Sequence, residues 1–588
     1  MTEQKTIKEK EQISASGEFN PSKKAEKIMR DGDILAEDES ATEMLERVAS
    51  VTIDIEKDFG TRREEAFEFA EKMLNLFMDR KIVPSTPIMT NAGRFDERPL
   101  SACSVPPVDL NNDYSEIKEK VDNYHEEGMG TGFALDKADD PMSVLMDLQE
   151  IAKTGLERDE QHRPVGNMGI MKADNPAIKE FIKVKHENPE IDWKFNLSVN
   201  MSDDFIEAYR KGEMFELRDG EKVDSGELMD LIVKCAWDCA DPGLIFLDNM
   251  NRRRPFNEEL NYVSVAPCGE VGLAEGETCQ FASINIAEFS DGKSIDWEGL
   301  EEASKLITRF LDDVLEYSLN HYSHEESVEA MRKSRKIGIG YCGYSKLLAK
   351  HGLKYDSEEG NQLLKDTLSF INFHSKKYSV ELANDRGNFA GWESSKYAEE
   401  GRNFLKDKFG DKESRKITEA DWRGLDKMIE RRGLRNSTTV ILPPTGRSAM
   451  TFDTSQQIEP IFSLIDRYGD VNEEFEEALN SYSEVDAESI LEKVKENGSC
   501  QDLDIPDDIK DVFRTAIEIG HREHFNVLVE AQSFVDESVS KTINLPSDVD
   551  PEAVKEVYLK AYDAGLNGMT VYRNGSNQDQ PMDLKDEE

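Results

Sequence analysis

Apolar residues recur at helical spacing near the start of the chain. Residues 41–59 carry one such stripe, which predicts an amphipathic helix with Met44, Val48, Val51 and Ile55 on one face. A second helix is predicted to follow, because Thr61 and Glu64 match a capping box and apolar residues again share one face. We expect a disordered polar tail over residues 1–20 and an N-terminal helical region over residues 21–83.

Short apolar or alternating runs of strand length follow in the rest of the chain. They lie at residues 195–199, 244–247 and 437–442, with helical patterns between them, for example at residues 229–240 and 300–319. Strands that alternate with helices predict an α/β architecture over residues 84–576, of which a barrel is one form. Within it we expect an acidic helical surface excursion at residues 467–522. Residues 577–588 are predicted to be an acidic tail.

The chain is strongly acidic. Asp and Glu total 121 against 73 Lys and Arg, which gives a net charge of −48 spread along the whole sequence. The simplest account is a halophile-type solvated surface. Such a surface repels nucleic acid and anionic membranes, so we expect neither as a partner. An anionic ligand would need a locally positive site or one built from backbone N–H groups.

The cysteines are few and odd in number. The seven are Cys103, Cys235, Cys239, Cys268, Cys279, Cys342 and Cys500. Residues 1–12 lack the apolar stretch of a signal peptide, and no apolar run approaches the roughly 18 residues of a membrane span. Together these features predict reduced thiols in the cytoplasm. Cys235 and Cys239 have a spacing that could bind a metal from one helix, but no second pair accompanies them, so we predict core positions and no metal site.

One thiol stands out by its neighbours. Pro267 and Gly269 bracket Cys268, which predicts a tight turn between two short strands. Glu270 comes two residues later and can handle a proton at the same place. Catalysis by Cys268 is one interpretation. The other is a hairpin in which a buried cysteine is only a small apolar residue.

A second candidate site lies where a predicted strand meets a helix. Residues 438–442 run into Pro-Pro-Thr-Gly and then into a helix start. Free backbone N–H groups and the helix dipole would point at one place there, which suits a phosphate, and Arg447 could add a charged contact. A proline-rich connection without a ligand is the alternative. The glycine-rich stretch at residues 128–133 predicts a turn and is weak evidence for a site.

Taken in order, these stretches resemble the large catalytic subunit of ribonucleotide reductase, in its adenosylcobalamin-dependent class. The resemblance covers residues 40–576. Its pieces include Pro84-Ser-Thr-Pro87, Leu100-Ser-Ala-Cys103, Gly130-Thr-Gly-Phe133, Gly166-Asn-Met-Gly169, Pro267-Cys-Gly-Glu270, Arg335-Lys-Ile-Gly338, Pro444-Thr-Gly446 and Thr570–Ser576. Pro-Cys-Gly-Glu looks like the cobalamin-dependent form of the radical-cysteine loop. The C-terminal piece carries one tyrosine and not a radical-relaying pair, and no glycyl-radical motif follows.

The resemblance implies a fold and a chemistry. The fold would be a ten-stranded α/β barrel with Cys268 on a finger loop inside it. The reaction would be reduction of ribonucleoside di- or triphosphates to deoxyribonucleotides, which supplies DNA synthesis. Adenosylcobalamin would start the reaction by taking the hydrogen atom of Cys268. Glu270 would be the general base, and Cys103 with Cys279 would be the reducing dithiol that leaves as a disulfide.

Further residues follow from the same resemblance. Those implied to bind the substrate are Thr86, Ala102, Gly130, Ala266, Pro444, Thr445, Gly446, Arg447 and Ser448. A loop that carries specificity signals would include Arg163, Asn167 and Met168. Because no C-terminal cysteine pair is present to re-reduce the site, an external thioredoxin-like dithiol is the expected reductant. A homodimer is the implied assembly.

The chain departs from the family pattern at several places. The family usually has Asn at the position of Ala266, where it bonds to the substrate and the glutamate, and Asn again at the position of Ala134. The phosphate loop reads Thr-Gly-Arg-Ser-Ala where Thr-Gly-Thr-Ile-Ser is usual. Two alternatives therefore stand beside the reductase. One is a nucleotide-binding paralogue without turnover, and the other is a thiol-redox or metal-binding protein on an unrelated α/β fold.

Overall fold

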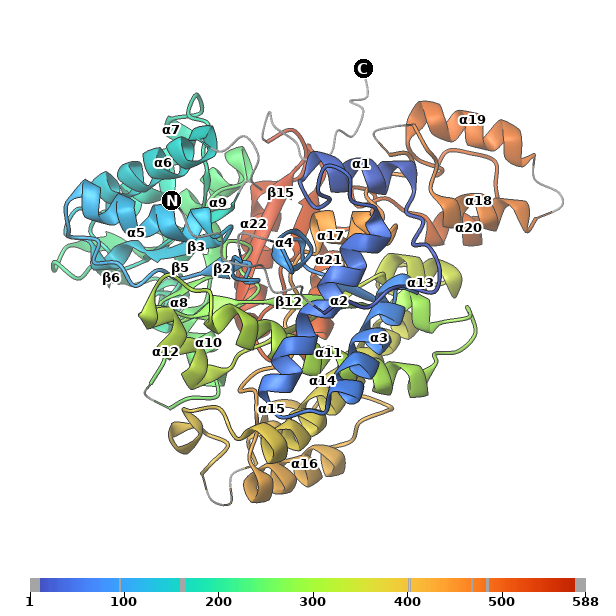
Figure 1. Ribbon diagram of the computed structural model, residues 1–588. Coiled ribbons are helices and arrows are strands. Elements are labelled where there is room, and N and C mark those ends of the chain that lie inside the picture. Colours follow the sequence, from blue (N-terminus) through green and yellow to red (C-terminus); the bar gives the residue numbers. More distant parts are fainter. Residues whose placement is uncertain are drawn as a thin grey trace.

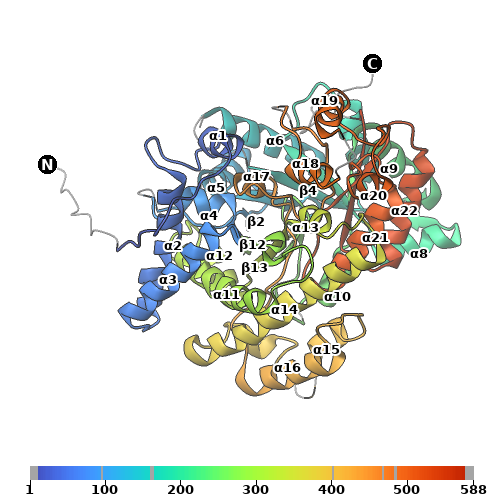
Figure 2. The same cartoon turned by 90° about the vertical axis from the view of Figure 1, so that its right-hand side faces the viewer.

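The structure is a computed structural model. It describes residues 11–94, 97–158, 165–257, 259–399, 401, 403–466, 469–482 and 486–576, and of residues 156–158 only the backbone. Helices pack around the outside and strands lie inside (Figures 1 and 2). No helix among these residues is long and apolar enough to cross a membrane.

The N-terminal region is helical, as predicted. Its helices are α1 (Lys23–Asp31), α2 (Ala41–Asp58) and α3 (Arg63–Met78). The helix predicted at residues 41–59 is confirmed, and it begins at a capping box made by Ser40 and Glu43. The predicted capping box of Thr61 is wrong: α3 begins without a side-chain cap, because the Thr61 hydroxyl donates to the Glu56 carboxylate at 2.6 Å instead.

The expected disordered tail is also wrong for residues 11–20. Ile13 and Phe19 are buried, so this segment adds apolar surface to the N-terminal core. Their backbone N–H groups donate to the hydroxyls of Ser50 and Thr42 in α2, at 3.1 and 2.9 Å. Residues 1–10 and the predicted acidic tail at 577–588 lie outside the described residues.

The strands form two parallel halves. The first half runs in the order β2 (Cys103–Ser104), β3 (Gly130–Ala134), β4 (Asn167–Lys172), β5 (Phe195–Asn200) and β8 (Gly243–Ile245). The second half contains β11 (Thr278–Cys279) leading into β12 (Phe281–Asn285), then β13 (Gly338–Cys342), residues 440–442, β14 (Thr542–Leu545) and β15 (Gly568–Arg573). The strand predicted at 195–199 is confirmed as β5. Of the strand predicted at 244–247, only residues 244 and 245 belong to β8, because a helix begins at Leu247.

Antiparallel pairs join the two halves at both edges. β8 pairs with β15 on one side, and β2 pairs with β11 on the other. Within the second half, residues 440–442 are held by isolated parallel bridges, Ile339 to Val440 and Leu442 to Val539. Ten strand segments thus follow one another in the order of the predicted α/β barrel, divided between an eight-stranded sheet that ends at β11 and β14 and a separate sheet that contains β12 and β13. β1 (Ile82–Pro84) adds an antiparallel edge to β12.

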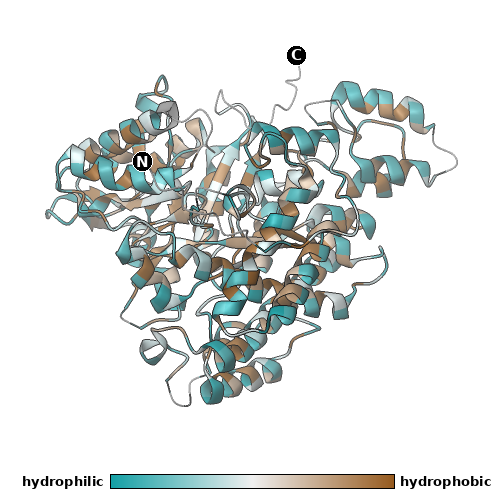
Figure 3. Cartoon of the chain, viewed as in Figure 1, coloured by the Kyte–Doolittle hydropathy of each residue, from teal (hydrophilic) through white to brown (hydrophobic). Residues whose placement is uncertain are grey.

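Helices cover the strands on the outside. The larger ones are α6 (Pro141–Arg158), α9 (Ser225–Cys239), α11 (Trp297–Leu319), α14 (Glu358–Arg386) and α22 (Pro551–Asp563). The helices predicted at 229–240 and 300–319 are confirmed as parts of α9 and α11. Figure 3 shows mostly hydrophilic residues on the helices nearest the viewer, in agreement with the charge of the chain.

The remaining elements connect these layers. The helices are α4 (Thr86–Asn91), α5 (Tyr114–Glu126), α7 (Ile178–Glu187), α8 (Asp203–Lys211), α10 (Leu247–Arg253), α12 (Glu325–Ser334), α13 (Tyr344–Lys350), α15 (Phe404–Phe409), α16 (Glu419–Arg432), α17 (Gly446–Thr451) and α21 (His521–Gln532). The short hairpins are β6 (Met214–Glu216) with β7 (Lys222–Asp224), and β9 (Ser264–Val265) with β10 (Gly272–Leu273).

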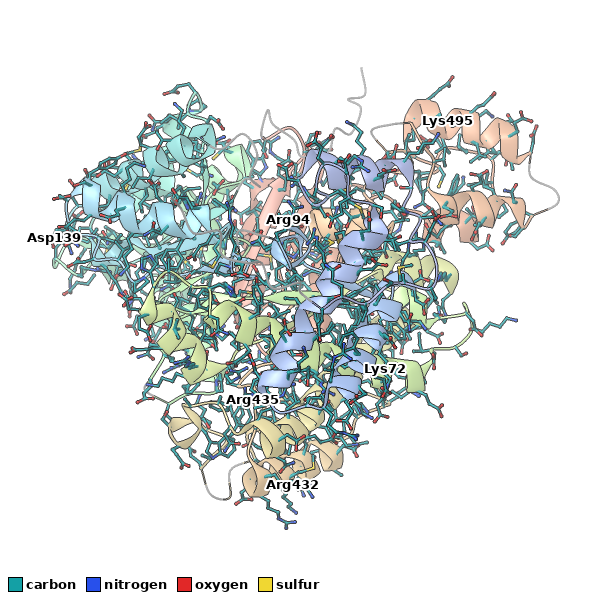
Figure 4. The ribbon with its side chains drawn as sticks, in the orientation of Figure 1. Lys72, Arg94, Asp139, Arg432, Arg435 and Lys495 are labelled. Atoms are coloured by element: carbon teal, nitrogen blue, oxygen red, sulfur yellow. The ribbon has the colours of Figure 1, made fainter. Side chains whose placement is uncertain are left out.

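One group of helices has a small core of its own. These are α18 (Glu473–Asn480), α19 (Ala487–Asn497) and α20 (Asp507–Val512), which project at the upper right of Figure 1. Their buried residues include Phe475, Val494, Cys500 and Phe513. Lys495 on α19 is labelled in Figure 4. This segment lies within the acidic excursion expected at residues 467–522.

A buried ionic cluster ties the N-terminal helices to the barrel. Asp312 of α11 binds Arg335, Arg386 and Arg435 at 2.7, 2.8 and 3.2 Å. The Glu56 carboxylate of α2 accepts from Arg309 and Arg386, each at 2.6 Å. Arg435 is labelled in Figure 4. Burial alone would raise the pKa of Glu56, but these two arginines outweigh it and lower the pKa to about 2.

Removing the Glu56 charge tests this cluster. Because its pKa is lowered on folding, its contribution is present above the ordinary pKa of 4.5 and is lost as the pH falls toward 2. We expect Glu56→Gln to lower the free energy of unfolding by about 3 kcal/mol at pH 7. In urea titrations the difference from the wild type should shrink below pH 4.5. Glu71→Gln, on the exposed face of α3, should have no such effect. A Glu56 variant with an unchanged midpoint at pH 7 would contradict the assignment.

Candidate active site

Cys268 lies at the tip of a hairpin. β9 and β10 pair antiparallel, and the turn between them is closed by Gly269 N–H to Ala266 O at 2.8 Å and by Ala266 N–H to Val271 O at 3.0 Å. Gly269 has φ +75, a conformation that other residues rarely adopt. The predicted tight turn is confirmed. Cys268 itself is exposed, so the thiol is accessible and is not an apolar core residue.

This hairpin, the finger loop (residues 264–273), lies directly against β3. A methyl group at Gly132 would come within 2.1 Å of the Val265 carbonyl oxygen. A methyl group at Gly130 would lie 3.0 Å from Pro267 and 3.6 Å from the sulfur of Cys103. The glycines at 130 and 132 are therefore required for close approach. The predicted turn at 128–133 is wrong beyond Gly128, because residues from Gly130 onward form a strand.

Three further contacts fix the finger loop from other sides. The Asn196 amide on β5 donates to Pro267 O at 3.1 Å. Ser538 N–H donates to Glu270 O at 3.0 Å, and the Lys336 ammonium donates to Gly272 O at 2.8 Å. The loop is thus bonded to both halves of the barrel, which holds Cys268 in one place.

Cys103 and Cys279 lie directly opposite each other. They are register partners in the antiparallel pair of β2 and β11. Directly opposed residues have Cα atoms about 4.5–5.5 Å apart, which is within the range of a disulfide. Both are buried, at 7% and 3% exposure, and neither is joined in a disulfide. The structure therefore brings together two cysteines that are far apart in sequence.

The finger loop and the cysteine pair share one environment. Ala266, Val271 and Leu273 of the loop pack in one cluster with Cys103 and Cys279. Burial raises the pKa of the Cys279 thiol well above its ordinary value, the Glu270 carboxylate raises it further, and the Lys336 ammonium acts in the opposite direction. Cys268 also contributes to this shift. The four predicted catalytic residues thus converge, and an unrelated fold with separated thiols is excluded.

The predicted phosphate loop leads into α17 as expected, but two of its backbone N–H groups already donate hydrogen bonds within the loop. Residues 440 and 442 are bridged to neighbouring strands, and the helix begins at Gly446. Thr445 has φ +56 and Gly446 has φ +37, which makes a sharp bend. The N–H groups of Gly446 and Ser448 donate to Pro444 O and Thr445 O, at 2.6 and 2.9 Å. These two N–H groups are therefore not free for a ligand in this conformation, contrary to the expectation.

The Arg447 side chain takes another direction from the one expected. Its Nη1 lies 2.9 Å from where a methyl group on Gly32 would be, and Gly32 is the C-terminal cap of α1. The guanidinium therefore lies beside the C-terminal end of α1. Cations are favoured there by the helix dipole.

The other residues predicted to bind substrate offer mainly backbone groups and small side chains, and no charged groups. Thr86 begins α4 and is almost buried. Ala102 bonds through its backbone, accepting from Gly130 N–H at 2.8 Å and donating to Cys279 O at 2.6 Å. Ala266 is fully buried in the finger loop, where it offers only a methyl group.

Two members of the predicted specificity loop can be described, and both lie in β4. Asn167 begins β4 and is buried, with its Oδ1 bonded to Thr131 at 2.7 Å and to His125 at 3.0 Å. Met168 packs inside the barrel against Val265. Neither side chain is exposed to an effector, because both belong to the strand and not to the loop before it. Arg163 lies outside the described residues.

No group of three or more His, Cys, Asp or Glu side chains among the described residues could hold a metal ion. Cys235 and Cys239 lie in α9, where the Cys239 thiol donates to the carbonyls of Cys235 and Asp241 at 3.2 and 3.4 Å. The sequence reasoning missed Asn196 and Lys336 as supports of the finger loop. Lys336 belongs to a motif that carried the resemblance, but nothing in one sequence indicates what its side chain contacts.

Comparisons with known proteins agree with this geometry. The family model of the ribonucleotide reductase barrel domain matches residues 133–572, and that of the ribonucleotide reductase all-alpha domain matches residues 25–96. The α subunit of the class Id ribonucleotide reductase of Actinobacillus ureae superposes with a TM-score of 0.74. The superposition covers 95% of this chain and 97% of the Actinobacillus ureae chain. The sequences are 20% identical, so this likeness shows only that the two proteins share a fold.

Two relatives are similar in sequence over most of this chain. The vitamin B12-dependent ribonucleoside-diphosphate reductase of Thermoplasma acidophilum is 31% identical over 88% of this chain, which spans 66% of that protein. The enzyme of the same description from Mycobacterium tuberculosis is 30% identical over 92% of this chain, which spans 77% of it. The chain belongs to the large-subunit family of ribonucleotide reductases. Within that family, these relatives group it with the vitamin B12-dependent class.

The close approach at Gly132 can be tested directly. We expect Gly132→Ala to lower the free energy of unfolding by roughly 2–4 kcal/mol, because the added methyl must displace the finger-loop backbone. Gly424→Ala, at an exposed position of α16 with nothing within 4 Å, should be neutral or slightly stabilising. Denaturant titrations of the two variants make the comparison. Equal stabilities would contradict the described packing.

The cysteine pair predicts a specific oxidation product. Mild oxidation with diamide should join Cys103 and Cys279, because their opposed positions allow an unstrained disulfide. Peptide mapping should find this link in the wild type and lose it in Cys103→Ser. Cys342→Ser, at a buried thiol on β13, should leave the link intact. A product that joins any other cysteines first would contradict the geometry.

Proposed function

We propose that this protein reduces ribonucleotides to 2′-deoxyribonucleotides by a thiyl-radical mechanism. The single observation that carries the proposal is the convergence of an exposed thiol, Cys268, with a buried and opposed thiol pair. A radical step and a two-electron reduction need these two kinds of thiol side by side. The names of the B12-dependent relatives support the same activity. They also favour ribonucleoside diphosphates over triphosphates as substrate.

Cys268 acts as the radical residue. It gives up its sulfur-bound hydrogen atom and, as a thiyl, takes the 3′-hydrogen atom of the substrate ribose. The backbone hydrogen bonds of the turn hold the Cys268 sulfur in place. Because Cys268 is exposed, the bound substrate and cofactor would have to keep bulk water away from the radical.

Glu270 acts as the general base. Its side chain is 2% exposed, and its backbone carbonyl is held by Ser538. A buried carboxylate two residues from the radical sulfur can take the proton of the 3′-hydroxyl when the ribose lies over the loop tip. Proton transfer of this kind contributes roughly 10²–10⁴-fold to a rate.

Cys103 and Cys279 supply the reducing equivalents. Their two S–H bonds deliver two electrons and two protons as the 2′-hydroxyl leaves as water, and a disulfide forms between them. Reduction of that disulfide requires an external dithiol of the thioredoxin type. Thiols that must cycle in this way fit a reducing compartment, so we propose the cytoplasm as the location and a homodimer as the assembly.

The cofactor that we propose is adenosylcobalamin, as the names of the relatives suggest. The residues present fit it in one respect: Cys268 is an exposed thiol that a carbon-centred radical can reach. When bound, the cofactor supplies the 5′-deoxyadenosyl radical. The nucleotide would lie over the loop tip, near Thr86, Ala102, Gly130 and Ala266. Its phosphates would be near Pro444–Ser448 at the start of α17, after a rearrangement that frees the N–H groups there.

The proposed function predicts a clear pair of variants. Purified protein supplied with ribonucleoside diphosphates, adenosylcobalamin and dithiothreitol should form deoxyribonucleotides, measured by chromatography. Cys268→Ala should abolish the product, because no other described thiol occupies the loop tip. Glu270→Gln should lower the rate by roughly 10²-fold or more, because the hydroxyl proton loses its acceptor.

The control is Cys500→Ser, which changes a thiol buried in the separate core of α18–α20 and should leave the rate unchanged. Two outcomes would overturn the proposal. One is product formation by Cys268→Ala at the rate of the wild type. The other is nucleotide binding by the wild type without any product, which would indicate a binding paralogue.

A further inference from the structure

The Tyr322 hydroxyl links the two segments that carry the paired cysteines. Tyr322 follows α11, and its hydroxyl bonds to the Ser101 hydroxyl at 2.6 Å and to the Thr278 hydroxyl at 2.7 Å. Ser101 lies two residues before Cys103, and Thr278 directly precedes Cys279. Ser101 and Thr278 are both fully buried. One side chain from outside the strand pair therefore contacts both cysteine segments.

The strand pair itself is short. β2 and β11 have two residues each. Backbone hydrogen bonds between the two segments run from Ala102 N–H to Cys279 O at 2.6 Å and from Val105 N–H to Glu277 O at 3.2 Å. Strands in globular proteins usually have about 3–10 residues, so this ladder provides few of the bonds that hold a pair in register. Side-chain contacts have to add to them.

A network of hydroxyl and amide groups supplies such contacts. The Gln280 side-chain carbonyl accepts from the hydroxyls of Ser101 and Thr278 at 3.3 and 3.4 Å, and these two hydroxyls are 3.3 Å apart. The bonds of Tyr322 at 2.6 and 2.7 Å are shorter and close to the usual length for two hydroxyls. Tyr322 therefore makes the strongest bonds of this network. Its loss would leave the other two hydroxyls only the longer contacts.

The network is anchored at α11. The Ser318 hydroxyl near the end of this helix accepts from Leu100 N–H at 3.0 Å, directly before Ser101. The same helix carries Asp312, the carboxylate at the centre of the buried ionic cluster. Tyr322 thus contacts the cysteine segments from a helix that is itself held in place.

The network also reaches the finger loop. The Gln280 side-chain amide donates to Lys336 O. The Lys336 ammonium in turn donates to Gly272 O of the finger loop at 2.8 Å. Bonds therefore run without a break from Tyr322 through the strand of Cys279 to the hairpin that carries Cys268.

We propose that Tyr322 is a positioning residue that holds Cys103 and Cys279 opposite each other and thereby favours their disulfide over the two separate thiols. This inference rests on the proposed function, in which the cysteine pair is the reductant. Tyr322 touches neither sulfur and would act only through the segments that carry them.

The effect follows from the chemistry of the pair. When it is oxidised, two S–H bonds break, one S–S bond forms, and two electrons and two protons pass to an acceptor, which is the 2′ position of the substrate in turnover. Two thiols that are already held in bonding geometry lose little freedom when the S–S bond forms. Weaker holding raises that cost, so the pair gives up its electrons less readily.

The test is the equilibrium of the cysteine pair with mixtures of reduced and oxidised dithiothreitol, measured on the full-length protein. After an acid quench and alkylation, mass spectrometry gives the fraction of Cys103 and Cys279 joined as a disulfide. In Tyr322→Phe, which keeps the ring, the equilibrium constant for disulfide formation should fall about tenfold. For this two-electron couple a tenfold fall raises the reduction potential by about 30 mV.

Two further variants keep the test decisive if Tyr322→Phe does not fold. Thr278→Val and Ser101→Ala each remove one partner of the Tyr322 hydroxyl, and each should shift the equilibrium in the same direction. Combined with Tyr322→Phe, Thr278→Val should add less than its effect alone, because both changes remove the same bond.

Tyr124→Phe is the matched control. The Tyr124 hydroxyl is also buried and bonds to another hydroxyl, that of Ser327, at 2.9 Å, but it contacts neither cysteine segment. This variant loses a similar bond and should leave the potential of the cysteine pair unchanged, even if urea titrations show that both tyrosine variants are equally destabilised.

Three results would overturn the proposal. They are an unchanged potential in Tyr322→Phe, an equal shift in Tyr124→Phe, and a folded wild type that forms no disulfide between Cys103 and Cys279 in any of the mixtures. The measurement needs no nucleotide or cofactor. A shifted potential in a protein that makes no deoxyribonucleotide would therefore support the role of Tyr322 and count against the proposed function alone.

Discussion

The close approach of the finger loop to β3 is the constraint on which the rest of the structure depends. The Val265 carbonyl occupies the space where a side chain at residue 132 would begin, so the loop can lie there only against glycine. This contact places Pro267 against Gly130, which is next to the Cys103 sulfur, and it thereby sets the position of Cys268 relative to the thiol pair. The two parallel halves of the barrel provide an interior wide enough for a hairpin, and their antiparallel edge at β2 and β11 brings Cys103 opposite Cys279.

Charge plays a different part in each layer of the molecule. On the outside, the helices carry mostly hydrophilic residues (Figure 3), and the whole sequence has an excess of carboxylates over cations. Inside, carboxylates are paired with arginine or lysine, as Asp312 is with Arg335 and Glu277 is with Lys336. The first of these pairs belongs to the buried cluster in which Glu56 of α2 also accepts from Arg309 and Arg386, which joins the N-terminal helices to the barrel. The second lies between the finger loop and the strand of Cys279, because Lys336 also donates to Gly272 O.

Much of this arrangement could be predicted from the sequence, and the failures have physical causes. The periodicity of α2 and α11 gave correct helices because their apolar faces pack on the core. Cys268 was recognised from Pro267 and Gly269, because a tight turn depends on local residues. The partnership of Cys103 and Cys279 came only from resemblance to a family, since register between distant strands is not a local property. The glycines of β3 were interpreted as a turn, because close approach and bending require the same residue. Arg447 was placed near a ligand by its neighbours in sequence and Asn167 by resemblance to a family, yet each side chain bonds or packs elsewhere.

The central claim is that the thiol of Cys268 becomes the radical that reacts with substrate. Electron paramagnetic resonance on samples frozen rapidly after mixing protein, ribonucleoside diphosphate and adenosylcobalamin tests it most directly. The account predicts a signal that changes its hyperfine structure when the protein is made with β-deuterated cysteine and that is absent in Cys268→Ala. A signal that persists in Cys268→Ala, or one that does not respond to deuterated cysteine, would contradict it.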